Sequence, residues 1–358
     1  MNVGICFGGY CPLHRGHLDL IMKSKKLNDL TYVVVCGYDG EERGDSYDLP
    51  LIKRYRIIKN FLEDELLKVI YVNDTELGLD ESMSPENWII WTRDIQNKIG
   101  YSEENNYIWY VAEPFYKERL TTNCSFKSTV SLEDRTLNPV SGTKCRENPL
   151  KYWNIITAPF RAYFSHNILI AGTASEGKTT LVRDIGKYYG LPYSYEKGRD
   201  NCHLKTDPEF NVKDFMYNIY EQHKYNEELI CSPQNPGIFI SDTDNFVTLM
   251  YANYYRKREG FAIDDEDFNV LYEMTKAYCK TTKWDKIFLL APRPKDIIDD
   301  GERYMPDSDY QIRCEFFEYL KSLYDEFGYE YEILNGTYYE NYLKVRKYID
   351  ELYGKAES

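Results

Sequence analysis

The chain has 358 residues, long enough for two domains that each bury a hydrophobic core of their own. Its 44 Lys and Arg residues against 58 Asp and Glu residues give a formal net charge of −14, which argues against broad binding of nucleic acid through its phosphates. No apolar run approaches the roughly 18 residues that a membrane span requires, and the N-terminus lacks the basic residues of a signal peptide.

The first half of the chain alternates apolar strands with amphipathic helices. Four apolar runs predict buried strands at 2–7, 32–37, 69–72 and 107–111. Helical patterns fill the intervals near 16–27, 51–68 and 86–99. This alternation, at the spacing of βαβ units, predicts a parallel α/β domain.

A loop rich in glycine joins the first strand to the first helix. It begins at Gly8 and reads Gly-Gly-Tyr-Cys-Pro-Leu-His-Arg-Gly-His, with its two imidazoles at His14 and His17. Glycines let backbone amides approach an anion, and the positive end of the following helix adds to this attraction. Residues three apart are neighbours on a helical turn, so both imidazoles can donate hydrogen bonds to one triphosphate and stabilise departing pyrophosphate. Exposed or metal-binding histidines are the alternative interpretation.

A second phosphate-binding segment is predicted at the end of this half. Ser141 and Thr143 supply hydroxyls where a helix starts, and Arg146 supplies a guanidinium fork that matches phosphate oxygens. An ordinary helix N-cap is the alternative for this segment taken alone.

The alternation restarts beyond a junction at 147–166. Apolar strands are predicted at 167–171, 237–241, 286–290 and 329–334, and an amphipathic helix at 178–189. Residues 172–179 match GxxxxGK[ST] without a mismatch, between a strand and a helix as this P-loop motif requires. The residues predicted to bind ATP here are Gly172, Ser175, Gly177, Lys178, Thr179 and Thr180. Lys178 is expected to reach the β- and γ-phosphates, and Thr179 to bind Mg²⁺.

An acidic partner for the P-loop is expected at the end of a later strand. Asp242 and Asp244 follow the apolar run at 237–241. Asp242 is the Walker B-like candidate for Mg²⁺, and Asp244 is placed to face the acceptor hydroxyl. Which of the two acids is the base stays open, and an ordinary acidic turn is the alternative.

Two charged segments suit a small-molecule kinase. Glu196, Arg199 and Asp200 follow the P-loop helix and can bind ribose hydroxyls and the transferring phosphate. Arg303, with Arg313 behind it, is predicted to close over the γ-phosphate as part of a lid that excludes water. A solvated charged loop is the alternative for these segments.

The order of these motifs resembles that of the bacterial bifunctional nicotinamide-nucleotide adenylyltransferase/ribosylnicotinamide kinase family. The shared motifs are HxGH at His14, Gly16 and His17, the Ser141–Arg146 segment, the P-loop, Gly198-Arg199-Asp200 and Asp242-Thr243-Asp244. The resemblance implies a Rossmann-like nucleotidyltransferase domain over 1–155 and a P-loop kinase domain with a parallel sheet over 163–358. Some relatives carry an N-terminal helix-turn-helix repressor domain, which we do not expect here because the first predicted strand begins at residue 2.

The resemblance implies two ATP-dependent reactions that use Mg²⁺. The C-terminal domain would phosphorylate nicotinamide riboside to nicotinamide mononucleotide (NMN), and the N-terminal domain would transfer AMP from ATP to NMN, giving NAD and pyrophosphate. The implied catalytic residues are His14, His17, Arg146, Lys178, Asp242 and Asp244. The implied ATP-binding residues of the first domain are Gly8, Tyr10, Gly16, Glu113, Ser141 and Thr143. Trp88 or Trp91 would stack on the cationic nicotinamide ring, with core packing of both as the alternative.

Two rival functions remain open at this point. A fused phosphopantetheine adenylyltransferase/dephospho-CoA kinase joins the same two motifs, although the Gly-Arg-Asp segment and the tryptophan pair favour the nicotinamide family. A nucleotide-sensing protein with one inactive domain is the second rival, and the intact His17 and Lys178 weigh against it.

The nine cysteines form no CxxC pair, as is typical of reduced thiols, so we expect a cytoplasmic protein. Whether it forms a homo-oligomer is not predicted.

Overall fold

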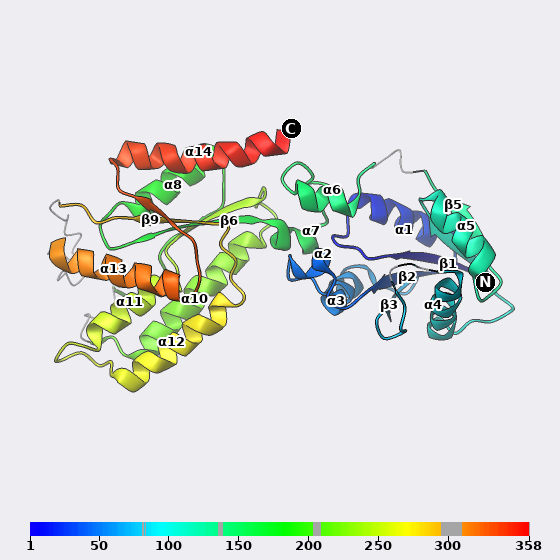
Figure 1. The fold of residues 1–358 in the computed structure, drawn as a ribbon, viewed down its shortest axis with the longest axis horizontal. Coiled ribbons are helices and arrows are strands. Elements are labelled where there is room, and N and C mark those ends of the chain that lie inside the picture. The colour runs from blue at the N-terminus through cyan, green and yellow to red at the C-terminus, as the bar shows by residue number, and fades with distance from the viewer. Residues whose placement is uncertain (81, 83, 135–138, 203–208, 295–309, 358) are drawn as a thin grey trace. The chain divides into compact units, whose positions relative to one another are not determined.

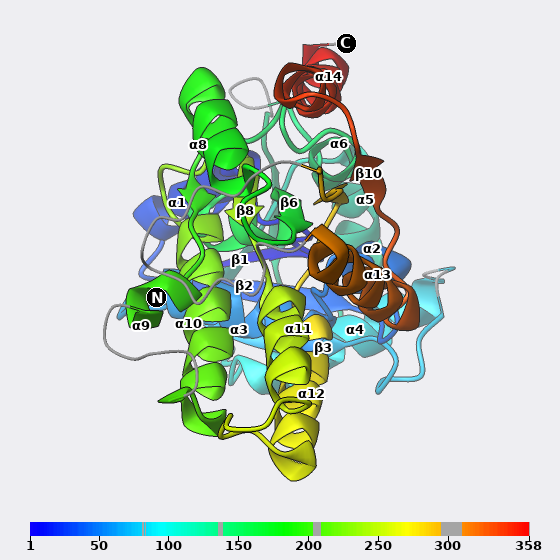
Figure 2. The ribbon, with the colours of Figure 1, turned by 90° about the vertical axis from the view of Figure 1, so that its left-hand side faces the viewer.

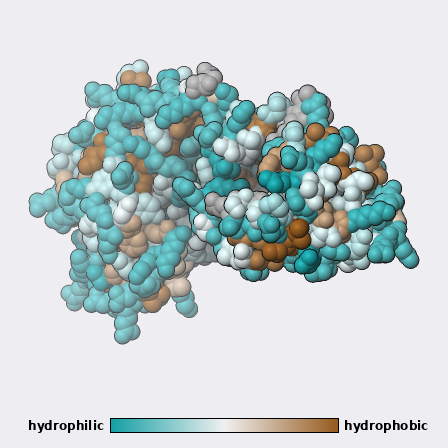
Figure 3. Space-filling model, turned by 45° about the vertical axis from the view of Figure 1, so that its right-hand side comes forward, coloured by the Kyte–Doolittle hydropathy of each residue, from teal (hydrophilic) through white to brown (hydrophobic). Residues whose placement is uncertain are grey.

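The computed structural model describes residues 1–80, 82, 84–134, 139–202, 209–294 and 310–357. The chain divides into two compact units, Met1–Phe164 and Ser165–Ser358. Each unit contains a five-stranded sheet with helices packed on it (Figure 1). Within the described residues, no helix has the combination of length and apolar composition needed to cross a membrane. The face drawn in Figure 3 is largely hydrophilic, in keeping with the high charge content.

The sheet of the first unit is parallel throughout and has the order β3-β2-β1-β4-β5. Its strands are β1 (Asn2–Gly8), β2 (Leu30–Gly37), β3 (Leu67–Asn73), β4 (Asn106–Val111) and β5 (Thr129–Leu132). Chain order reverses between β1 and β4, and ligands of such sheets bind at the carboxyl ends of the strands beside this point. The loop that carries both histidines follows β1, so the topology places it at this position.

Helices cover both faces of this sheet. The helices of this unit are α1 (Arg15–Leu27), α2 (Glu42–Asp45), α3 (Leu51–Leu62), α4 (Pro85–Lys98), α5 (Pro114–Asn123), α6 (Gly142–Glu147), α7 (Ala158–Arg161) and the short η1 (Ala162–Phe164). Successive residues of one strand enter different cores: Val33 and Val35 pack in one buried cluster and Val34 in the other. Burial on both faces explains why β2 is continuously apolar.

The predicted helix at 51–68 is too long. Helix α3 ends at Leu62, and β3 begins at Leu67. The Glu63 carboxylate accepts a hydrogen bond from the Val69 N–H (3.1 Å), and the Asp64 carboxylate accepts one from the Leu66 N–H (2.9 Å). These side chains replace the helical hydrogen bonds and turn the chain into the strand.

The second unit also has a parallel sheet, in the order β10-β9-β6-β8-β7. Its strands are β6 (His166–Gly172), β7 (Tyr193–Ser194), β8 (Ile238–Asp242), β9 (Lys286–Leu290) and β10 (Glu332–Leu334). The predicted strand at 329–334 is shorter than expected, because Tyr329 and Tyr331 pack against the core before β10 begins. The central position of β6 puts the P-loop, which follows it, between β8 and β9.

Two groups of helices sandwich this second sheet. Figures 1 and 2 show α8 and α14 on one face and α10 to α13 on the other. The helices are α8 (Lys178–Tyr189), α9 (Gly198–Cys202), α10 (Val212–Ile230), α11 (Asn245–Tyr255), α12 (Asp265–Cys279), α13 (Tyr310–Glu326) and α14 (Tyr338–Glu357). The larger core lies on the α10–α13 face, where strand residues such as Leu169 and Leu289 meet Ile219, Leu249 and Leu320.

Candidate active sites

The two histidines of the first unit lie together at the start of α1. His14 occupies the N-cap position and is buried, and its backbone N–H donates a hydrogen bond to Nδ1 of His17 (3.4 Å). The two imidazole rings stack with their centroids 3.7 Å apart. Tyr10 packs edge-on against the His17 ring at 4.9 Å. The sequence motif therefore produces a paired imidazole surface.

The second predicted phosphate-binding segment packs directly on this histidine loop. Arg146 donates through Nη1 to the Cys11 carbonyl (2.6 Å) and through Nη2 to the Thr143 hydroxyl (3.2 Å). The Ser141 hydroxyl caps α6 by accepting from the Lys144 N–H (3.3 Å). A Cβ at Gly142 would lie only 3.1 Å from the Cys11 carbonyl oxygen, so glycine allows this close approach.

A cavity of about 550 Å³ opens beside the paired imidazoles. This volume is within the usual range for a site that binds a small molecule. The residues predicted from the sequence that line it are Gly8, His14, His17, Trp88, Trp91, Glu113, Ser141 and Thr143. Tyr10, Gly16 and Arg146 are not among the residues that line it.

The tryptophan pair, Trp88 and Trp91, packs in the hydrophobic core and also lines the cavity. Trp88 and Trp91 are each 2% exposed and pack edge-on against Phe7, with ring centroids at 6.3 and 5.1 Å. Both also line the cavity. The two interpretations offered by the sequence therefore do not exclude each other.

Sequence reasoning missed two charged residues of this cavity, Arg43 and Asp74. Arg43 forms an ion pair with Glu41 (2.6 Å), and its guanidinium lies 2.9 Å from where a Cβ at Gly9 would be. Burial, assisted by the charge of Glu41, raises the pKa of Asp74 to about 7. The available signal was position: Asp74 directly follows the buried strand β3.

The P-loop of the second unit has the backbone that phosphate binding requires. Ser175 and Gly177 have positive φ angles of 60° and 90°, which turn successive amides toward one side of the loop. At Gly172 a Cβ would come within 2.7 Å of the Leu290 carbonyl oxygen, so only glycine fits. The Lys178 ammonium donates to the Thr173 carbonyl (2.9 Å), and Thr180 lies half-buried in the first turn of α8.

Four further residues gather around Lys178. The Thr179 hydroxyl donates to the Asp242 carboxylate at 2.5 Å, and Arg199 donates to the Thr179 hydroxyl at 3.3 Å. Burial raises the pKa of Asp242, while the charge of Lys178 opposes that rise and the charge of Glu196 adds to it. The structure thus joins the P-loop, the end of β8 and the Gly-Arg-Asp segment in one charged site.

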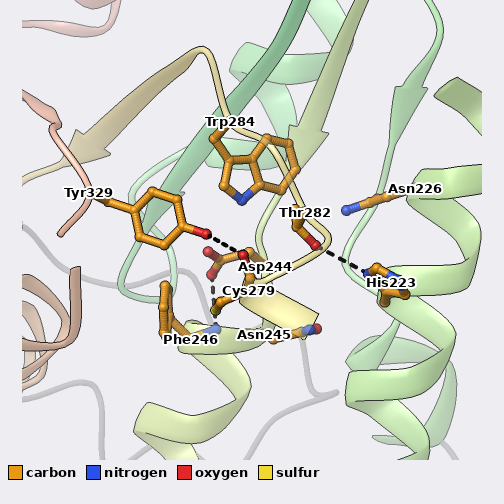
Figure 4. Close-up of a pocket in the computed structure, with 9 residues that line it drawn as sticks. All are labelled: His223, Asn226, Asp244, Asn245, Phe246, Cys279, Thr282, Trp284 and Tyr329. Atoms are coloured by element: carbon orange, nitrogen blue, oxygen red, sulfur yellow. Dashed lines mark hydrogen bonds between the residues drawn. The ribbon is translucent and has the colours of Figure 1, made fainter. Parts of the chain in front are cut away.

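Asp244 does not belong to this charged site, contrary to the expectation that it faces the acceptor hydroxyl. Its carboxylate caps α11 by accepting from the Phe246 N–H (3.1 Å), and it also accepts from the Tyr324 hydroxyl (2.9 Å). Asp244 lines a cavity of about 20 Å³, which has room for one water molecule, and Figure 4 shows it beside Phe246 and Tyr329. Thr243, with φ of 82°, turns the chain between the two acids, so they point into different surroundings.

The remaining charged residues predicted for the kinase site are Asp200, Arg303 and Arg313, and the two that the structure describes differ in their surroundings. Asp200 is exposed and accepts from the Lys197 ammonium (3.1 Å). Arg313 is fully buried and forms an ion pair with Glu176 of the P-loop, which Arg293 also contacts at 3.4 Å. Arg313 is therefore part of the support of the P-loop rather than of a lid. Arg303 lies outside the described residues.

Comparisons with known proteins cover nearly the whole chain. The AAA domain family model matches residues 167–341. The trifunctional NAD biosynthesis/regulator protein NadR of Salmonella typhimurium is 25% identical over 268 residues, which are 72% of this chain and 64% of that protein. The chain thus spans less than two thirds of this curated relative.

Two solved structures match more completely. A NadR protein in complex with NAD and AMP-PNP is 30% identical, with a TM-score of 0.84, over 99% of this chain and 96% of that one. A NadR protein in complex with NR is 32% identical, with a TM-score of 0.81, over 94% of this chain and 91% of that one. The chain belongs to the NadR family. This membership confirms the expected family and the expected α/β fold class. In this chain the two motifs that the sequence analysis singled out lie one in each unit.

Proposed function

We propose that this protein is a bifunctional enzyme of NAD biosynthesis and salvage. The second unit transfers the γ-phosphoryl group of ATP to nicotinamide riboside, which gives NMN. The first unit transfers AMP from a second ATP to NMN, which gives NAD and pyrophosphate. One observation carries the proposal: this chain of the NadR family has two different candidate sites, one in each unit. The first unit has a cavity lined by the paired histidines, and in the second unit the P-loop is hydrogen-bonded to the acidic end of a strand.

In the first unit, catalysis rests on position and charge. The NMN phosphate attacks the α-phosphorus of ATP directly, and no covalent bond to the protein forms. His14 and His17 donate hydrogen bonds to the triphosphate and stabilise the charge that develops on pyrophosphate. Arg146 holds the histidine loop through the Cys11 carbonyl and presents its positive charge to the same phosphates.

In the second unit, the residues present fit Mg²⁺. The Thr179 hydroxyl and the Asp242 carboxylate are hard oxygen ligands held 2.5 Å apart, and Mg²⁺ in nucleotide sites takes few protein ligands beside phosphate oxygens. When bound, the ion neutralises charge on the β- and γ-phosphates. Lys178 contacts the same phosphates, and Glu196 and Arg199 orient the acceptor riboside. Of the two candidate acids, we assign the role at the phosphates to Asp242.

Product analysis tests the proposal directly. The purified chain is incubated with ATP, Mg²⁺ and nicotinamide riboside, and the products are identified by mass spectrometry. We expect NMN, then NAD, with ADP and pyrophosphate as the other products. Parallel reactions with phosphopantetheine and with dephospho-CoA should give no product. Products only in those reactions, or riboside binding without phosphorylation, would contradict the proposal and favour one of the two rivals.

A further inference from the structure

Three side chains from other elements hold the histidine loop of the first unit. Carbonyl oxygens at alternate positions of the loop each accept a hydrogen bond, and they belong to Gly9, Cys11 and Leu13. The donors are, in the same order, Arg54 of α3, Arg146 of α6 and Thr157, which directly precedes α7. The loop is therefore fixed by residues that lie outside its own motif.

The contact with Thr157 is part of a short antiparallel pairing of two chain segments. The Thr157 hydroxyl and the Thr157 N–H both donate to the Leu13 carbonyl, at 2.9 and 3.2 Å. The Arg15 N–H donates to the Ile155 carbonyl (2.9 Å), and residues 14 and 156 form an antiparallel bridge between these contacts. The backbone of His14 is therefore held by segment 155–157 on both of its sides.

The Leu13 carbonyl and the His14 N–H belong to one peptide group. A peptide group is planar, so the hydrogen bonds that fix the direction of this carbonyl also fix the direction of the N–H. That N–H donates to Nδ1 of His17 at 3.4 Å. Thr157 therefore acts on the orientation of the His17 ring through one rigid peptide group.

The same contact selects the tautomer of His17. A ring nitrogen that accepts a hydrogen bond carries no proton, so in the neutral His17 ring the proton is on Nε2. His17 lines the cavity, and its Nε2–H is then the ring group that can donate to a phosphate oxygen. Loss of the contact would allow the ring to turn, or its proton to move to Nδ1.

We propose that Thr157 is a positioning residue for adenylyl transfer, a role that rests on the proposed function of the first unit. Its hydroxyl holds the peptide group between Leu13 and His14, and this peptide group holds Nδ1 of His17. The Nε2–H of His17 is thereby directed at the departing pyrophosphate. Thr157 is 5% exposed and does not line the cavity, so it acts through the histidine loop and not by contact with a substrate.

Steady-state kinetics of the full chain test this role. Thr157→Val removes the hydroxyl, but the backbone N–H still donates to the Leu13 carbonyl, so no buried acceptor loses its last donor and the variant should fold. We expect kcat for NAD formation from NMN to fall about 5- to 10-fold, with KM for NMN within about twofold. Thr157→Ser keeps the hydroxyl and should keep kcat within about twofold of the unaltered protein. Riboside phosphorylation, measured on the same preparations, should not change.

Two further variants separate positioning from a general effect of losing a threonine hydroxyl. Thr122→Val removes an exposed hydroxyl that donates to the Glu118 carbonyl (2.9 Å) within α5, and it should leave both reactions unchanged. Thr157→Ala removes the buried hydroxyl together with a methyl group, and it should lower kcat at least as much as Thr157→Val. The alanine variant keeps the inference testable if valine does not fit at this position.

A double-mutant cycle decides whether Thr157 acts through the His17 imidazole. Once His17→Ala has removed the ring, adding Thr157→Val should lower kcat for NAD formation by less than about twofold more. If the two losses multiply in the double variant, or if a folded Thr157→Val keeps the kcat of the unaltered protein, the inference is overturned. Failure of the unaltered protein to make NAD from NMN would instead refute the proposed function of the first unit.

Discussion

The two units place their proposed phosphate-binding loops after an interior strand of similar sheets, but the two loops differ in construction. In each unit the loop follows an interior parallel strand and leads into a helix: β1 and α1 in the first, β6 and α8 in the second. The first loop offers side chains, a stacked imidazole pair backed by Arg146. The second offers backbone, with residues of positive φ, and one lysine. Under the proposed function, the position in the fold determines where phosphate binds in each unit, and the residues of the loop determine which phosphate bond breaks.

The comparison is tested most strongly at the P-loop lysine. Lys178→Ala removes the ammonium group that we propose contacts the β- and γ-phosphates, so riboside phosphorylation should fall at least about 10³-fold. NAD formation from NMN should remain within twofold of the unaltered protein, as measured by separate assays of the two reactions. A matching loss of both activities in a folded variant would show that the two sites are not independent.

The converse variant is His17→Ala. It removes one imidazole of the stacked pair, so adenylyl transfer to NMN should fall by about 10²- to 10³-fold. Phosphorylation of nicotinamide riboside is the internal control and should not change. A loss of riboside phosphorylation in this variant would contradict the prediction, because the histidine loop would then act on the reaction of the other unit.

Asp242 and Asp244 sharpen the comparison within the second unit. Asp242→Asn weakens the acidic partner of Thr179, so kinase activity should fall about 10²-fold. Asp244→Asn alters a buried helix cap and should change kcat by less than about fivefold. If Asp242→Asn and Asp244→Asn reduced riboside phosphorylation equally, Asp244 would also have to be assigned to the active site.

The smallest effect concerns stability and pH. Burial raises the pKa of Asp244 from 3.8 to about 7, so the folded state holds a proton that the unfolded state releases. Stability from this group therefore falls as pH rises from about 4 to 7, by no more than a few kcal/mol, and is flat above that range. Asp244→Asn should remove this dependence in urea unfolding monitored by tryptophan fluorescence. If the free energy of unfolding depended on pH identically in the unaltered protein and in Asp244→Asn, this prediction would be wrong.

Much of this structure could be predicted from the sequence because loops with demanding backbones leave strong signals. The P-loop needs Gly172 and Gly177 for close approach and positive φ, and the spacing of these residues fixes the loop between strand and helix. Continuous apolar runs likewise predicted the interior strands. The short edge strands β5 and β7 escaped, because they are too short to show an apolar pattern.

Side-chain direction was harder to predict than backbone. Asp242 and Asp244 look equivalent in sequence, and only the turn at Thr243 and the hydroxyl of Tyr324 separate them. Asp74 was missed because a single acid after a strand has no motif, and its environment comes from α4 and β2. Properties that depend on tertiary neighbours are those that local patterns do not encode.

The buried glutamate of the P-loop constrains how this loop can be exchanged with others. Glu176 is 1% exposed and pairs with Arg313, and Arg293 contacts both its carboxylate and its backbone carbonyl (3.1 Å). Removing one member of a buried ion pair typically costs about 3–5 kcal/mol, far more than a surface pair. A loop grafted from a kinase with serine at this position would thus need compensating changes at both arginines. In this protein the P-loop is thus held by an arginine that follows β9 and by another in α13, so these three segments form one structural unit.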